Sequence, residues 1–113
     1  MRGASPADAA RAFRDGALFL DVRSQAQHAR DGLQGSRGLP LEAIQAGELP
    51  ADAQMDAPIY LVCERGLLSE LAGLYLEQAG FLHTFNVLGG LRALRPLLDV
   101  DQGRQAWKNT PSM

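Results

Sequence analysis

The amino-acid sequence predicts an α/β domain built around a mainly parallel sheet. Two nearly unbroken apolar runs, residues 17–22 and 59–63, have the length and composition of strands that are covered on both faces. Each run is followed by a segment with helical features, and a third strand-like segment at residues 84–88 precedes another helix. Strands that alternate with helices are typical of parallel sheets with helices packed on their faces.

The composition fits one domain and argues against several classes of partner. The chain has 113 residues, of which 46% are apolar and 21% are charged, and its formal net charge is −2. We expect one domain over residues 1–101 and a loosely held tail at residues 102–113. Lysine and arginine form no block, so neither nucleic acid nor a membrane is expected as a partner. No leader-like apolar segment is visible, and a cytoplasmic location is expected.

The first helix is expected to begin at Ser5 and Pro6. Ser5 is a suitable N-cap, Pro6 fits the first helical position, and Asp8 stands where a capping box has an acid. The helix stops at Gly16, and the four residues before Ser5 leave little room for a preceding strand. After the strand at 17–22, the sequence predicts a polar helix at 24–30, a short strand at 37–39, a brief helix at 41–47 and exposed turns at 50–58.

The strongest helix signal follows the strand at 59–63. Apolar residues recur at helical spacing from Leu71 onward, and Gly80 followed by Phe81 is a typical C-terminal cap. The strand at 84–88 ends in Gly89-Gly90, which predicts a tight turn rather than a dinucleotide-binding fingerprint. A last helix is expected at 91–98, and Pro96 must bend or restart it.

Cys63, the only cysteine, ends the second buried strand, and a helix is expected about six residues later. In open α/β sheets, ligands bind beyond the carboxyl ends of the strands. The backbone N–H groups of residues 64–69 are therefore positioned to surround the sulfur and to favour its thiolate form. A buried cysteine without chemistry is the alternative that position alone leaves equally open. A single cysteine also excludes an internal disulfide.

Four separated stretches resemble the rhodanese homology pattern, over residues 17–94. Residues 20–23 (LDVR) resemble the family's "(L/I)DVR" strand end, and residues 35–41 (GSRGLPL) resemble its "GArNIPL" segment. Residues 60–69 (YLVCERGLLS) resemble its cysteine loop, "vvyCrsGnRS". Residues 79–81 (AGF) and 87–90 (VLGG) resemble "aGF" and "nLeGG". Each stretch alone is a weak signal, but their order and spacing together are specific.

The resemblance implies a rhodanese-like fold, in which a five-stranded sheet carries helices on both faces, and a sulfurtransferase that uses no cofactor. Cys63 matches the family's nucleophile, which takes sulfane sulfur from a donor such as thiosulfate. The resulting persulfide passes to a thiol or protein acceptor. The loop positions that match the family's substrate-binding segment are Glu64, Arg65, Gly66, Leu67, Leu68 and Ser69. Asp21 and Arg23 match largely structural positions near the rim of the site.

One departure from the family pattern concerns the substrate. Leu68 replaces the arginine that is frequent at the sixth loop position, which removes a contact for an anionic donor. Weak thiosulfate activity is therefore expected, with Arg65 or Arg37 as substitute cations. Leu67 and Leu68 also suit an apolar docking patch, although Leu68 is expected to pack inward more than Leu67. A non-catalytic rhodanese-like protein-binding module is accordingly the alternative function.

Other chemistries fit the sequence less well. A cysteine phosphatase has an arginine six residues after its cysteine, where this chain has Ser69. Arsenate reduction through an internal disulfide needs a second cysteine. His28 and His83 have no ligand spacing to each other or to Cys63, so no metal site is expected. The sequence contains no feature that indicates an oligomeric state.

Overall fold

Five parallel strands form one sheet in the order β1-β5-β4-β2-β3, as the sequence predicts for the class. The computed structural model describes the backbone of residues 1–102 and the side chains of residues 1–98. The strands are β1 (Arg2–Ala4), β2 (Leu18–Asp21), β3 (Arg37–Gly38), β4 (Ile59–Val62) and β5 (Thr84–Val87). The helices are α1 (Pro6–Arg14), α2 (Gln25–Asp31), α3 (Leu41–Gln45), α4 (Leu68–Gln78) and α5 (Gly90–Gln102).

Strand β1 shows that the expectation of little room before the first helix was wrong. Arg2, Gly3 and Ala4 pair in register with residues 85–87 of β5. β1 is the edge strand of the sheet, so it needs hydrogen bonds to one neighbour only, and three residues are enough to make them. Its partner strand lies near the other end of the sequence, and no local pattern in residues 1–4 reveals that pairing.

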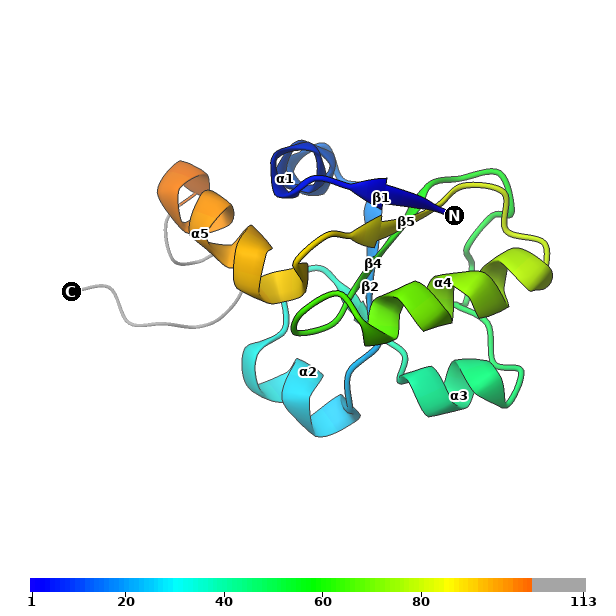
Figure 1. Ribbon diagram of the computed structural model, residues 1–113. Coiled ribbons are helices and arrows are strands. Elements are labelled where there is room, and N and C mark those ends of the chain that lie inside the picture. Colours follow the sequence, from blue (N-terminus) through cyan, green and yellow to red (C-terminus); the bar gives the residue numbers. More distant parts are fainter. Residues whose placement is uncertain (103–113) are drawn as a thin grey trace.

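Helices cover both faces of the sheet, with α1 and α5 on one side and α3 and α4 on the other (Figure 1). Consecutive strand residues face opposite layers: Phe19 belongs to the core under α1 and α5, and Leu20 to the core under α3 and α4. The central strands are therefore buried on both faces, which explains their unbroken apolar runs. β4 lies between β2 and β5, so the loops that follow these three strands meet at one edge.

The helix ends follow the local signals in the sequence. Ser5 Oγ accepts the Asp8 N–H at 3.1 Å, and Ser24 closes a capping box with Gln27 at the start of α2. α5 runs through Pro96 as one helix, so the helix does not restart there. Apart from Gln102, the expected tail at residues 102–113 lies outside the described residues. Within residues 1–102, no helix combines the length and apolar character needed to traverse a bilayer.

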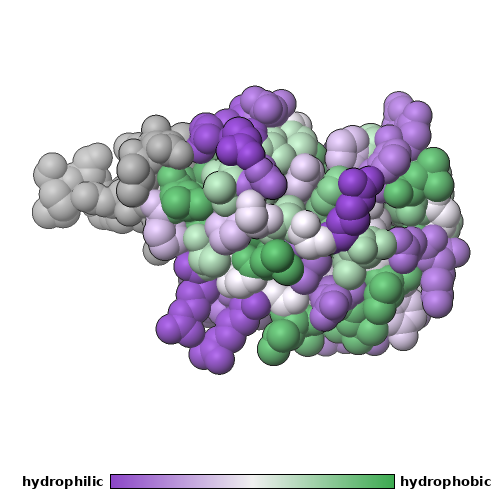
Figure 2. Space-filling model, turned by 45° about the horizontal axis from the view of Figure 1, so that its top comes forward, coloured by the Kyte–Doolittle hydropathy of each residue, from purple (hydrophilic) through white to green (hydrophobic). Residues whose placement is uncertain are grey.

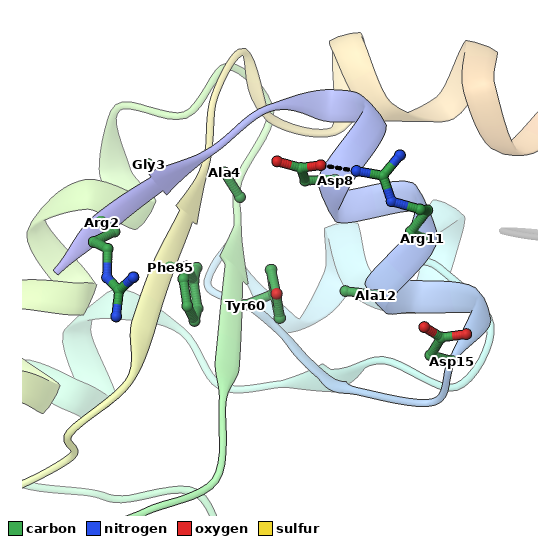
Figure 3. A pocket seen from close by; sticks show the side chains of 9 residues that line it. All are labelled: Arg2, Gly3, Ala4, Asp8, Arg11, Ala12, Asp15, Tyr60 and Phe85. Carbon is green, nitrogen blue, oxygen red and sulfur yellow. Dashed lines mark hydrogen bonds and ion pairs between the residues drawn. The ribbon is translucent and has the colours of Figure 1, made fainter.

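A row of stacked side chains crosses the sheet near the amino ends of the strands. Phe19, Tyr60 and Phe85 occupy paired positions of β2, β4 and β5, with ring centroids 5.0 and 4.8 Å apart. The Arg2 guanidinium lies over the Phe85 ring, 5.4 Å from its centroid. Figure 3 shows Tyr60 and Phe85 of this row, which line an opening of about 460 Å³ together with residues of β1 and α1.

Candidate active site

The Cys63 loop lies at the carboxyl edge of the sheet, opposite the aromatic row. Cys63 follows β4 directly, the loop continues to Leu67, and α4 begins at Leu68. Only 2% of the Cys63 surface is exposed. Because β4 is flanked by β2 and β5, the loop is bordered by the segments that leave both strands. The cysteine thus occupies the position where parallel α/β sheets bind ligands.

Two backbone N–H groups converge on the sulfur of Cys63. Gly66 donates to Sγ at 3.2 Å and Ser69 donates at 3.3 Å. Ser69 is the second residue of α4, and Leu67 provides no side-chain cap, so the sulfur itself accepts one of the free N–H groups at the helix start. Among the described residues, no hydrogen bond is donated by the backbone N–H groups of Arg65, Leu67 or Leu68. The loop therefore keeps unused donors.

The first turn of α5 is hydrogen-bonded to the Cys63 loop. The N–H groups of Leu91 and Arg92 donate to the carbonyls of Cys63 and Glu64 at 2.9 and 3.1 Å. Gly89 and Gly90 both have positive φ angles, which confirms the predicted tight turn. A Cβ atom on Gly90 would lie 2.5 Å from the Cys63 carbonyl oxygen. This close approach requires glycine and fixes the loop backbone against the start of α5.

A buried arginine joins the loop to its neighbours. Arg23 is only 4% exposed; its guanidinium contacts Asp21 at 2.9 Å, Asp31 at 2.9 Å and Glu64 at 3.3 Å. Burial lowers the pKa of Arg23, but hydrogen bonds and charges from Asp21 and Asp31 outweigh it and raise that pKa above its ordinary value. Arg95 contacts Glu64 and Asp31 at 3.3 and 3.4 Å. Glu64 is therefore tied to two arginines, and no sequence motif had pointed to Asp31 or Arg95.

Asn86 is a second contributor that the sequence did not single out. The Ser69 hydroxyl donates to Asn86 Oδ1 at 2.6 Å, and Asn86 Nδ2 donates to the Gly66 carbonyl at 3.1 Å. Ser69 Oγ also lies 3.4 Å from Cys63 Sγ, and all three side chains are buried. The available signal was a polar amide, Asn86, between the apolar residues Phe85 and Val87 of β5.

The remaining predicted residues divide between the loop and other places. Arg65 is exposed on the loop, whereas Arg37 donates to the Ala51 carbonyl in the segment before β4. Leu67 is 74% exposed and Leu68 is 51% exposed, so Leu68 is the less exposed of the two, as expected, although neither side chain is buried.

The two histidines lie apart from the Cys63 loop. His28 lies on α2, where its Nε2 contacts Ser36 Oγ at 3.1 Å. His83 precedes β5, and its carbonyl accepts the N–H of Ile59 at the start of β4. Among the side chains that the structure describes, no three histidine, cysteine or acidic groups are clustered for a metal ion.

The chain is similar in sequence and fold to several known proteins. Residues 5–96 match the family model of the rhodanese-like domain. The thiosulfate sulfurtransferase GlpE of Pseudomonas fluorescens (strain Pf0-1) is 35% identical over 91 residues, which cover 80% of this chain and 82% of the relative. The crystal structure of a rhodanese homolog from Thermus thermophilus is 36% identical with a TM-score of 0.66, covering 81% of this chain and 99% of that chain. A rhodanese-related protein from Thermoplasma volcanium has a TM-score of 0.71 at 23% identity, covering 83% and 90% of the two chains.

Proposed function

Because the chain belongs to the rhodanese-like domain family, we propose that it is a sulfurtransferase in which Cys63 carries sulfane sulfur as a persulfide. The observation that carries this proposal is the convergence of the Gly66 and Ser69 N–H groups on Cys63 Sγ. Backbone donors aimed at a sulfur stabilise its thiolate form, which is the nucleophile. The unused N–H groups of Arg65, Leu67 and Leu68 supply donors for an outer sulfur or for the oxygens of a bound donor molecule.

The proposed reaction has two displacement steps. In the first, the Cys63 thiolate attacks the sulfane sulfur of the donor, a new S–S bond forms, and the leaving group departs with the electron pair of the broken bond. In the second, a thiolate of the acceptor attacks the outer sulfur of the persulfide. The Cys63–sulfur bond breaks, the outer sulfur moves to the acceptor, and the Cys63 thiolate is restored. One cysteine suffices, because the acceptor comes from outside the chain.

The surroundings of the loop favour a weakly charged donor or a protein acceptor over thiosulfate. Arg23 and Arg95 are both engaged by carboxylates, which leaves Arg65 as the cation on the loop itself. Leu67 and Leu68 present apolar side chains at the loop apex. Relatives bear the name thiosulfate sulfurtransferase, and we propose that this chain uses thiosulfate weakly.

Intact mass measurement tests the proposal directly. After incubation with thiosulfate, or with an organic persulfide as a less charged donor, we expect the protein to gain the mass of one sulfur atom. Adding a small thiol should remove that mass again. The Cys63→Ala variant, whose fold is checked by circular dichroism, should gain nothing. An unmodified wild-type mass with every donor, at a pH where Cys63 reacts with an alkylating reagent, would overturn the proposal.

The second candidate function, a non-catalytic binding module, is favoured by one observation. Five apolar side chains recur at helical spacing from the loop apex along α4, with exposed fractions between 37% and 74%: Leu67, Leu68, Leu71, Leu74 and Tyr75. Figure 2 shows hydrophobic patches at the surface between hydrophilic residues. The mass measurement decides between the candidates, since a binding module needs no sulfur transfer.

A further inference from the structure

We propose that Asn86 is a positioning residue that sets the protonation state of Cys63 by orienting the hydroxyl of Ser69. This inference deepens the proposed function, because it concerns the same sulfur atom. Asn86 does not contact Sγ in the hydrogen bonds of the described residues; it acts through Ser69, whose Oγ lies 2.6 Å from Asn86 Oδ1 and 3.4 Å from Cys63 Sγ.

The orientation of the Asn86 amide follows from its partners. The Gly66 carbonyl oxygen can only accept a hydrogen bond, so the amide nitrogen of Asn86, 3.1 Å away, must face it. The amide oxygen therefore faces Ser69. A serine hydroxyl carries one proton, and Ser69 donates that proton to Asn86 Oδ1. What Ser69 turns toward Cys63 is consequently a lone pair.

This arrangement treats the two forms of Cys63 differently. A neutral thiol can donate its S–H to Ser69 Oγ, whereas a thiolate meets a lone pair and gains nothing from the hydroxyl. Turning the Ser69 proton toward a thiolate would leave the buried Asn86 oxygen without a donor, which is unfavourable. The N–H groups of Gly66 and Ser69 favour the thiolate, and the Ser69 hydroxyl, held by Asn86, favours the thiol. Asn86 thereby moderates the reactivity of the resting sulfur.

Charged residues stand on the loop and on the elements around it, and the test leaves all of them unchanged. They are Glu64 and Arg65 on the loop, Asp21 and Arg23 at the end of β2, Asp31 on α2, Glu70 on α4, and Arg92 and Arg95 on α5. Within the described part of the chain, none of their side chains makes a hydrogen bond to Cys63 Sγ.

The rate of Cys63 alkylation by iodoacetamide, measured against pH, tests the proposal without any sulfur donor. In Asn86→Ala the Ser69 proton is released toward the thiolate, so the midpoint of the profile should move to lower pH and the rate at neutral pH should rise about tenfold. The single variant Ser69→Ala and the double variant Ser69→Ala/Asn86→Ala both lack the hydroxyl. These two variants should therefore have the same midpoint. Thr84→Val, a buried change two residues earlier on β5, is the matched control and should leave the midpoint at its wild-type value.

The shape of the profile separates positioning from simple loosening of the loop. If Asn86 only holds the loop closed, its removal raises the plateau rate at high pH and leaves the midpoint where it was. That result, or a midpoint that moves equally in Asn86→Ala and in the double variant, would overturn the proposal. Sulfur loading by intact mass is a separate measurement, so failure of the sulfurtransferase proposal and failure of this one give different results.

Discussion

The two ends of the central strands are organised by different kinds of interaction. At the carboxyl end, the Cys63 loop is fixed by directional hydrogen bonds and by the ion pairs of Arg23, nearly all of them buried. At the amino end, rings stack across β2, β4 and β5, and an opening of about 460 Å³ lies beside Tyr60 and Phe85 (Figure 3). Backbone N–H groups converge on the buried cysteine, whereas the opening is lined by two of the rings and by residues of β1 and α1. Donor geometry, more than the size of an opening, therefore marks the candidate site.

This difference predicts that replacing a charged side chain lowers stability more at the carboxyl end of the strands than at the amino end. Arg23→Met should lower the free energy of unfolding by about 3–5 kcal/mol, because Asp21 is left as a buried, unpaired carboxylate. The matched control is Arg2→Met at the amino end, where an exposed guanidinium stacks on Phe85 and the loss should stay below about 1 kcal/mol. Urea unfolding followed by circular dichroism measures both. An equal loss of unfolding free energy in the two variants would contradict this difference between the two ends of the strands.

A smaller loss of stability is expected when the close packing of Gly90 against the Cys63 loop is disturbed. Gly90→Ala places a Cβ against three backbone atoms of residues 63–65 at a positive φ angle. Gly16→Ala has a positive φ angle as well, but no atom lies within 4 Å of its Cβ, so it isolates the conformational cost. Gly90→Ala should be the more destabilising of the two by about 2 kcal/mol in urea unfolding. A difference near zero would show that the loop adjusts freely to the turn.

The smallest effect is expected in the aromatic row. Tyr60→Leu removes the ring contacts with Phe19 and Phe85 and should lower the free energy of unfolding by about 1 kcal/mol. Tyr60→Phe keeps both of these contacts and should leave the free energy of unfolding unchanged. Sulfur loading of Cys63, measured by intact mass, should be the same in both variants as in wild type. Loss of loading in Tyr60→Leu would show that the two ends of β4 are coupled.

Features that depend on neighbouring residues could be predicted from the sequence alone. Ser5 caps its helix as predicted, Gly89-Gly90 forms the expected turn, and the apolar runs become the central strands. Cys63 lies at the end of its strand before a helix, as the motif predicts. These features follow from local dihedral preferences and from strand and helix periodicity, which a short segment expresses without reference to the rest of the chain.

Which distant residues meet around Cys63 depends on the three-dimensional arrangement of the chain. Asn86 reaches Ser69 because β5 lies next to β4, and residues 2–4 form a strand because the free edge of β5 accepts them. Glu64 is held by Arg23 and Arg95, which come from different elements. Leu67 and Leu68, at the start of α4, stay exposed although both are apolar. Such contacts depend on strand order and helix placement, and these are set by burial of the whole core rather than by any local pattern.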